Sequence, residues 1–152
     1  MDQIDQDLNA AETRCRAQGE RLTPKRRQVL EQLLREGHAR SAYELVDALN
    51  EQTGRRPPAM SVYRILAVLE KCGLVHKLDS TSKYVACKHI TECGEHAGPQ
   101  LLICDNCDNV YEIDLHATLK RSLKEHARAA GFEINNGKLE LHGRCADCGA
   151  RS

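Results

Sequence analysis

The sequence contains no tryptophan, and its 152 residues include only four tyrosines and one phenylalanine. Leucine, valine, isoleucine and alanine must therefore fill any hydrophobic core. A chain of this length forms either one domain or two small ones, each with a modest core. Because two small cores poor in aromatic residues would be only marginally stable, we expect a cross-link or a bound metal ion to stabilise at least one of them.

Long apolar runs are also missing. No stretch approaches the roughly 20 apolar residues that a membrane-spanning helix needs, and the first residues, Met1 to Asp7, are acidic and lack the apolar region of a secretory signal. We therefore expect a cytoplasmic protein with no membrane partner. The eight cysteines are too few for a disulfide scaffold, and in a reducing compartment paired cysteines more often bind metal than each other.

The net charge is zero, which argues neither for nor against a nucleic-acid partner. The distribution of charge is more informative. One short segment carries six basic residues against the single acid Glu20, and the basic residues are Arg14, Arg16, Arg21, Lys25, Arg26 and Arg27. This segment suits a phosphate backbone, but a solvated helix face has the same composition.

Four helices are predicted in the first half of the chain from apolar spacing and from signals at their ends. Thr23 and Pro24 form an N-cap followed by a proline at the first helical position. Ser41 and Glu44 form a capping box. The predicted helices cover residues 3–18, 24–36, 42–53 and 59–72.

Two β-prone runs, residues 74–78 and 83–87, surround the turn-rich residues 79–82 and predict a β-hairpin. Three helices followed by a hairpin are typical of a winged helix–turn–helix, in which the last helix is the recognition helix and the hairpin is the wing. We therefore predict a DNA-binding domain over residues 1–87.

The rest of the chain is predicted to form a hinge or linker, residues 88–99, and an α/β domain, residues 100–152. This domain begins with two short strands and a helix that Asp114 is expected to cap. Two further apolar runs, 132–134 and 139–141, flank an Asn-Asn-Gly turn and predict a second hairpin. The fold class is thus α+β, a winged-helix domain followed by an α/β domain.

Four cysteines occur as two Cys-x2-Cys pairs, Cys104 with Cys107 and Cys145 with Cys148. Each pair offers two corners of a tetrahedron, so the two pairs together predict a four-cysteine structural zinc site. Folding free energies of roughly 10–16 kcal/mol accompany zinc binding in small zinc peptides. A thioredoxin-like redox function is disfavoured because one pair would suffice and neither follows a βαβ pattern.

A mixed ligand set consists of His76, Cys87, His96 and Glu112. Two imidazoles, one thiolate and one carboxylate complete a four-coordinate zinc site. Four thiolates leave a formal charge of −2 around Zn²⁺, whereas the mixed set leaves none, so we expect the mixed site to release its metal more readily. Its sulfur ligand disfavours Mn²⁺ and Mg²⁺. We therefore predict two zinc ions per chain, one structural and one regulatory.

Other residues compete for places in the mixed set. His89 and Cys93 lie in the same linker and could replace its thiolate or its linker imidazole. His38, just before the third helix, is a candidate additional ligand. Taken singly, the strand histidine and the glutamate of the set are better explained as ordinary surface residues. The sequence assigns no role to Cys15 or Cys72.

Several motifs together resemble the ferric uptake regulator (Fur) superfamily over nearly the whole chain, and their joint occurrence is specific. They are the two Cys-x2-Cys pairs, Leu22-Thr23-Pro24-Lys25-Arg26, Ser41-Ala42-Tyr43, Ser61-Val62-Tyr63-Arg64 and Gly73-Leu74-Val75-His76-Lys77. Lys25 stands where the family usually has glutamine.

Within the superfamily the chain is most similar to the zinc uptake regulator (Zur) branch. The iron and peroxide branches carry a histidine-rich run before the first cysteine pair, whereas residues 95–100 contain only His96, and Cys87 lies on the predicted wing. The resemblance implies that the mixed set is regulatory and that the C-terminal domain forms a homodimer.

In the predicted recognition helix, Tyr63 and Arg64 are the main candidates to reach DNA bases. Arginine forms bidentate contacts with guanine that contribute about 1–3 kcal/mol of discrimination, whereas Tyr63 could equally be a half-buried helix residue. Tyr43 could contact a thymine methyl group or a phosphate. The residues expected to contact the phosphate backbone are Lys25, Arg26 and Arg27. A two-fold dimer should read an inverted repeat.

These patterns favour a zinc-responsive, homodimeric transcriptional repressor that binds a double-stranded, inverted-repeat operator when its regulatory site is filled and controls genes of zinc uptake and homeostasis. Two alternatives remain, namely a family member that senses iron, manganese or peroxide, and a zinc-buffering protein without DNA function. A zinc hydrolase is disfavoured because the chain has no His-Glu-x-x-His or comparable motif. We therefore expect no enzymatic activity and no small-molecule substrate.

Overall fold

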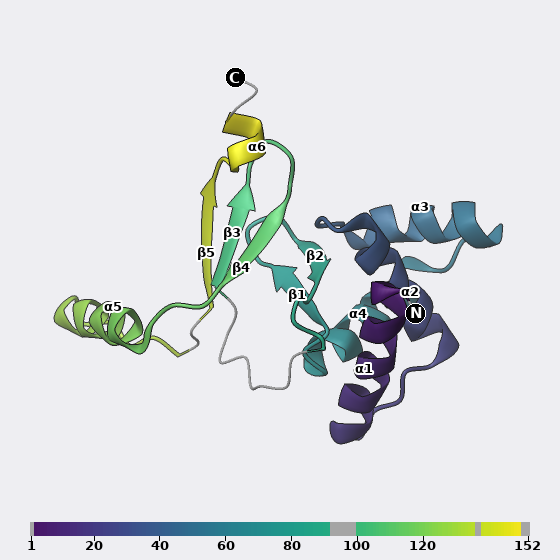
Figure 1. Ribbon diagram of the computed structural model, residues 1–152, viewed down its shortest axis with the longest axis horizontal. Helices are drawn as coiled ribbons and strands as arrows, with labels where there is room; N and C mark the ends of the chain where they lie inside the picture. Colours follow the sequence, from purple (N-terminus) through teal and green to yellow (C-terminus); the bar gives the residue numbers. More distant parts are fainter. Residues whose placement is uncertain (1, 92–99, 136–137, 150–152) are drawn as a thin grey trace. The chain divides into compact units, whose positions relative to one another are not determined.

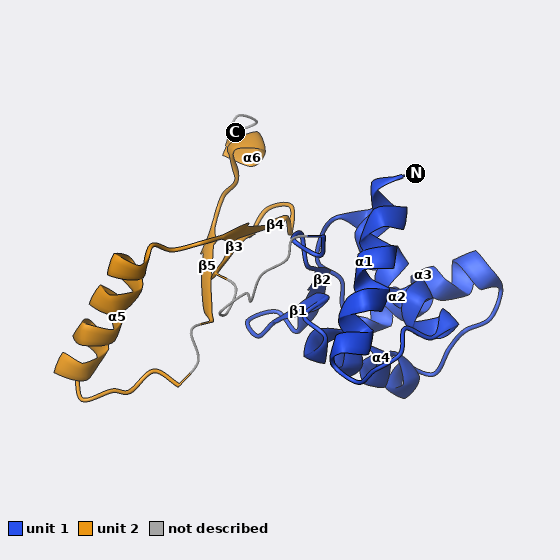
Figure 2. Ribbon diagram, turned by 60° about the horizontal axis from the view of Figure 1, so that its bottom comes forward, with its two compact units in different colours: residues 1–94 blue, residues 95–152 orange. Residues whose placement is uncertain are grey.

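The computed structural model describes residues 2–91, 100–135 and 138–149. The chain divides into two compact units, residues 1–94 and residues 95–152 (Figure 2). Most of the predicted linker, 88–99, lies outside the described residues, so its role as a hinge stays a prediction. None of the described helices is both long and apolar enough to cross a lipid bilayer.

Over residues 2–91, the first unit contains four helices followed by a two-stranded antiparallel sheet (Figure 1). The elements are α1 (Gln3–Ala17), α2 (Pro24–Glu36), α3 (Ala42–Thr53), α4 (Ala59–Lys71), β1 (Val75–Leu78) and β2 (Lys83–Ala86). β1 pairs with β2 so that His76 lies opposite Val85. The four predicted helices and the wing hairpin are therefore confirmed, and the unit has the element order of a winged helix–turn–helix.

The ends of α2 and α3 follow directly from their sequences. The Thr23 hydroxyl accepts a hydrogen bond from the Arg26 amide at 3.3 Å, and the Ser41 hydroxyl accepts one from the Glu44 amide at 3.1 Å. Each bond satisfies one of the amides that the first turn of a helix leaves without an intrahelical partner. Gly37 follows α2 with a φ of 70°, a left-handed conformation that glycine adopts without a steric penalty.

Replacing Thr23 with alanine removes the side-chain cap of α2 while leaving the buried face of the helix unchanged. We expect a loss of about 1 kcal/mol in the free energy of unfolding, the usual effect of removing an N-cap hydroxyl. Urea unfolding of the wild-type and variant proteins measures the difference. Thr81→Ala, in the exposed turn between β1 and β2, is the matched control and should change stability far less. Equal losses in the two variants would contradict the capping role.

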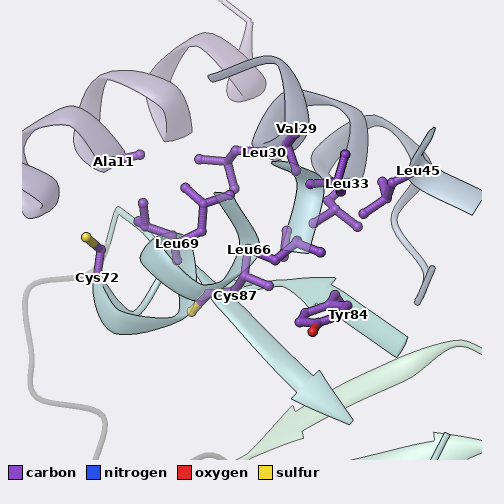
Figure 3. Close-up of a cluster of buried hydrophobic side chains, with 14 of the residues drawn as sticks. Ala11, Val29, Leu30, Leu33, Leu45, Leu66, Leu69, Cys72, Tyr84 and Cys87 are labelled. Atoms are coloured by element: carbon purple, nitrogen blue, oxygen red, sulfur yellow. The ribbon is translucent and has the colours of Figure 1, made fainter. Parts of the chain in front are cut away.

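The core of the first unit is aliphatic, as the shortage of aromatic residues requires. Leu30 of α2, Leu45 of α3, and Leu66 and Leu69 of α4 are each 0% exposed. Figure 3 shows these side chains gathered between the helices, with Tyr84 of β2 on the side of the strands. Because α4 buries one stripe of residues at helical spacing, its opposite face is left exposed.

The described residues of the second unit form a three-stranded sheet and two helices. Its elements are β3 (Gln100–Cys104), β4 (Val110–Ile113), α5 (Ala117–Ala129), β5 (Leu139–Gly143) and the short α6 (Ala146–Gly149). The strand order is β4-β3-β5, with β4 antiparallel and β5 parallel to the central β3 (Figure 1). The predicted strands 100–103 and 110–113 and the helix after them are confirmed.

The predicted hairpin of residues 132–134 and 139–141 is wrong. Residues 132–134 form no strand, and β5 pairs in parallel with β3, placing Leu141 opposite Leu102. The Asn-Gly turn signal depends only on neighbouring residues. The side of β3 that β4 does not cover can instead pair with β5, which makes β3 the central strand. Pairing there makes β3 hydrogen-bonded on both sides and buries Leu101 and Ile103. Asn136 and Gly137 lie outside the described residues.

The predicted cap at Asp114 is also wrong. Residues 114–116 follow β4 without helical structure, and α5 begins only at Ala117, with His116 in the N-cap position and no side-chain cap bond. α5 contains no buried residue within the described part of the chain, and Leu119 and Leu123 on its apolar side are 54% and 44% exposed. The periodicity of apolar residues predicted that a helix forms here, but it did not predict the residue at which the helix begins.

Candidate metal centres and DNA-binding surface

Four cysteines of the second unit converge at one end of its sheet. Cys104 ends β3, Cys107 lies in the following turn, Cys145 precedes α6 and Cys148 lies within it. Their sulfur atoms all lie within 4.8 Å of one another, and those of Cys107 and Cys145 are 3.7 Å apart. Zinc–sulfur bonds of about 2.3 Å give a tetrahedron with edges of about 3.8 Å. The cluster therefore has the size and the ligands of a four-cysteine zinc site.

The parallel pairing of β3 with β5 brings the two cysteine pairs together. Cys104 lies opposite Gly143 in this pairing, and the Asp105 amide donates a hydrogen bond to the Gly143 carbonyl at 2.9 Å. Parallel strands that end at the same edge of a sheet place the residues after them side by side. We call the turn of residues 104–108 the first knuckle. It is tight, because the Asp108 amide donates a hydrogen bond to the Cys104 carbonyl at 3.0 Å.

Backbone amides point at the sulfur atoms of the cluster. The amide of Cys145 donates to Cys104 Sγ at 3.3 Å. This hydrogen bond, and then that of the Cys107 amide, lower the pKa of Cys104 to about 6. The amide of Cys148 is the main cause of a lowered pKa at Cys145. Because zinc binds the thiolate, these amides favour the form of cysteine that coordinates metal.

Three residues around the cluster were missed by sequence reasoning. His142 Nδ1 lies 2.7 Å from Asp105 Oδ1, which links β5 to the first knuckle. A hydrogen bond to Cys145 raises the pKa of the Tyr111 hydroxyl, so this side chain also reaches the cluster. These contacts depend on the register of β4 and β5, and no sequence spacing indicates them. Groups of this kind orient metal ligands in zinc proteins.

The wing of the first unit carries the second candidate centre. His76 on β1 and Cys87, directly after β2, present ligand atoms within 4.8 Å of each other. We call these two residues the wing pair. Cys87 is 2% exposed, its amide donates to the Leu74 carbonyl at 2.8 Å, and its sulfur accepts the His89 amide at 3.4 Å. Figure 3 shows Cys87 at the edge of the aliphatic cluster. An imidazole and a thiolate side by side form half of a zinc site.

The other predicted members of the mixed set belong to the second half of the chain. Glu112 lies on β4, opposite Leu101, and is half-buried. His96 and its competitor Cys93 lie outside the described residues. The competitor His89 contributes its backbone amide to the Cys87 sulfur. His38 follows α2 and is half-buried. The complete mixed set therefore stays a prediction.

The exposed face of α4 and the start of α3 present the residues predicted to contact DNA. Tyr63 and Arg64 lie on the exposed face of α4, while Tyr43 in the first turn of α3 is 61% exposed. The rings of Tyr43 and Tyr63 meet edge to face, with centroids 6.3 Å apart. Met60, 62% exposed in the first turn of α4, was missed by sequence reasoning, although its position before the Ser-Val-Tyr-Arg motif indicates the same surface.

The predicted phosphate-contacting residues differ in their surroundings. Lys25 is exposed, and it lines a cavity of about 330 Å³ beside the start of α4, together with Arg55 and Arg56. Arg26 instead donates to the Arg21 carbonyl at 2.6 Å and pairs with Glu20, so part of its hydrogen-bonding capacity holds the chain before α2. Arg27 is half-buried. Arg55 adds a positive charge that the motif comparison did not single out, whereas the Arg56 guanidinium pairs with the Asp47 carboxylate at 2.6 Å.

Comparison with known proteins identifies the class. The model of the ferric uptake regulator family matches residues 17–142. Because this match covers most of the chain, the chain belongs to the ferric uptake regulator family.

Individual relatives narrow the comparison. The zinc uptake regulation protein of Escherichia coli (strain K12) is 36% identical over 141 residues, which cover 93% of this chain and 80% of that protein. The peroxide operon regulator of Bacillus subtilis (strain 168) is 28% identical over 146 residues, covering 93% of each chain. A solved structure of a zinc uptake regulator complexed with zinc and DNA has a TM-score of 0.84 and 32% identity, covering 99% of this chain and 98% of that one.

Proposed function

We propose that this chain is a zinc-responsive transcriptional repressor that acts in the cytoplasm and binds an inverted-repeat operator as a homodimer when its regulatory zinc site is filled. The genes under its control would serve zinc uptake and homeostasis. The observation that carries the proposal is the wing pair, because it places a borderline-soft ligand set on the element that flanks the recognition helix. Similarity to the zinc uptake regulation protein of Escherichia coli supports the choice of metal.

Two zinc ions per chain are proposed. The four cysteines would hold a structural ion, since their net charge with zinc is −2 and backbone amides already favour the thiolate forms of Cys104 and Cys145. The mixed set of His76, Cys87, His96 and Glu112 would hold the regulatory ion. Its ligands come from both units along the chain, so a bound ion would restrict the freedom of the linker.

The DNA contacts are proposed from the exposed face of α4. Arg64 would bind a guanine edge, whereas Tyr43, Tyr63 and Met60 offer apolar groups suited to thymine methyl groups. Lys25, Arg26 and Arg27 would contact phosphates. The apolar side of α5, with Leu119 and Leu123 exposed, suits burial against a second copy of the chain. Such a two-fold dimer would read an inverted repeat.

Two observations favour zinc over the other signals of the family. The wing pair contains a thiolate, which disfavours manganese and other hard ions. Identity to the peroxide operon regulator of Bacillus subtilis is 28%, against 36% for the zinc uptake regulation protein. A protein that only buffers zinc would have no use for the exposed face of α4. A measurement of binding to double-stranded DNA distinguishes such a buffer from a repressor.

Replacing Cys87 with serine tests the proposal. We expect Cys87→Ser to retain the fold, the dimer and the structural zinc, but to bind operator DNA in zinc about 10²-fold more weakly than the wild type. That factor follows if the DNA-binding arrangement is populated at about 1% without the regulatory ion. A gel-shift titration in zinc and in chelator measures it, using a duplex that the zinc-loaded wild-type protein selects from random sequences.

The matched control is Cys72→Ser, which alters another buried cysteine of the same unit, at the end of α4. Its zinc response should equal that of the wild type. If Cys87→Ser retains the full zinc-dependent affinity, the wing pair is not part of the regulatory site.

A further inference from the structure

Arg14 of α1 joins two points that are far apart in the sequence. Its Nη1 donates to the Gly73 carbonyl at 3.2 Å and its Nη2 donates to the His89 carbonyl at 2.8 Å. A guanidinium group presents its N–H donors in a rigid planar fork, so one side chain can hold two carbonyls in a fixed relation. The contact is partly buried, which shields it from competition with water.

The two carbonyls lie at the two ends of the wing. Gly73 precedes β1, and His89 follows β2. Between these ends, the Cys87 amide donates to the carbonyl of Leu74, the residue after Gly73, at 2.8 Å. Arg14 therefore closes the open end of the hairpin from outside, at the point where the chain enters the wing and where it leaves.

We call the two hydrogen bonds of Arg14 to the Gly73 and His89 carbonyls the Arg14 clamp. His89 connects this clamp to the sulfur of Cys87. Its amide donates to Cys87 Sγ at 3.4 Å, and its carbonyl accepts from Arg14 Nη2. Both backbone groups of one residue are thus used, one toward the thiol and one toward the guanidinium group. These two groups belong to successive peptide planes that share the His89 Cα, so a displacement of His89 that broke the bond to Arg14 would also change the position of its amide relative to the sulfur.

We propose that Arg14 is a positioning residue for the regulatory zinc site, holding the 87–89 segment so that the Cys87 sulfur is oriented to bind zinc. The inference rests on the proposed function. It gives α1 a part in metal sensing, although no side chain of α1 is a ligand in the proposed set. Partners that orient metal ligands through hydrogen bonds commonly change metal affinity by about 10- to 100-fold when they are removed.

The geometry of the Arg14 guanidinium group indicates which substitutions distinguish a positioning role from a contribution to packing alone. Arg14→Lys keeps the aliphatic stem and the positive charge, but its ammonium group is a single point that does not reproduce the two fixed donor directions. Arg14→Gln removes the charge as well. Arg16→Gln is the matched control, since Arg16 lies on the same helix and pairs with Glu12 through a side chain that is 75% exposed.

The experiment uses the whole 152-residue chain with its structural zinc in place. Competition with a chromophoric chelator measures the affinity of the second zinc, and cobalt substitution reports the sulfur-to-metal charge-transfer band of Cys87. We expect Arg14→Gln and Arg14→Lys to bind the second zinc about 10- to 100-fold more weakly, while operator affinity at saturating zinc stays within about threefold of the wild type. Arg16→Gln should match the wild type in every measurement.

The outcomes are distinguishable. If both Arg14 variants unfold more easily but bind the second zinc with wild-type affinity, Arg14 is merely structural and the inference is overturned. If Arg14→Gln fails to fold, Arg14→Lys decides the matter by the same measurement. If the wild-type protein binds a second zinc but its operator affinity does not depend on zinc, the proposed function fails. The zinc affinities of the variants still test the positioning role of Arg14. If the wild type binds no second zinc, both proposals fail.

Discussion

Cys104→Ser is expected to abolish the folded second unit. Cys104 is 2% exposed, ends the central strand and supplies one of four clustered sulfur atoms. Loss of one thiolate removes a ligand and leaves three thiols that no longer enclose a tetrahedral ion. Zinc binding contributes roughly 10–16 kcal/mol to folding in small zinc peptides, which is as large as the roughly 5–15 kcal/mol stability typical of a whole domain. The variant should therefore lose the structural zinc, and its second unit should no longer show a cooperative unfolding transition.

Circular dichroism, bound zinc and size-exclusion chromatography measure these losses in parallel. The matched control is Asp147→Ser, which changes an exposed residue between Cys145 and Cys148 without removing a ligand. It should retain zinc and the oligomeric state of the wild type. A Cys104→Ser protein that keeps a stable second unit without zinc would show that the sheet is stable on its own and that the cysteines are not structural.

Arg64→Ala is expected to remove most of the operator affinity while leaving both zinc sites intact. Arg64 lies on the exposed face of α4, away from the residues that α4 buries. Each bidentate contact with guanine contributes about 1–3 kcal/mol. A dimer makes the contact in each half-site, so the combined loss should be roughly 30-fold to more than 10³-fold in affinity. The discrimination between the selected operator and unrelated DNA should fall with it.

Fluorescence anisotropy with operator and unrelated duplexes measures both affinities at the same salt concentration, since phosphate contacts make every affinity depend on salt. Arg35→Ala provides the control, because Arg35 is an exposed arginine of α2 that pairs with Glu31. It should bind as the wild type does. Unchanged discrimination in Arg64→Ala would exclude α4 as the element that reads the operator.

The first unit was predictable because its signals are local. Thr23 and Ser41 occupy their N-cap positions, and glycines end α2 and α3, as the sequence indicates. Capping depends only on residues within one helical turn. The aliphatic positions of α4 recur at helical spacing and are buried, so the same pattern also predicted its exposed face.

The second unit was less predictable because its pairing is non-local. The Asn-Gly turn signal indicated a hairpin, but β5 pairs in parallel with β3 across a helix. The four cysteines were predictable from spacing, since each pair carries its own geometry. The surrounding contacts of Asp105, His142 and Tyr111 were not, because they arise only from the registers of three strands. The Arg14 clamp was likewise invisible, since its partners lie 59 and 75 residues away.

The most direct test of the central claim is zinc content per chain before and after mild chelation, with operator binding followed on the same samples. The account predicts two zinc ions at the start, of which one resists the chelator and one leaves, and operator binding should be lost in step with the second. Adding zinc back should restore both. Operator binding that persists with only the four-cysteine zinc present would contradict the claim that this chain is a zinc-responsive repressor.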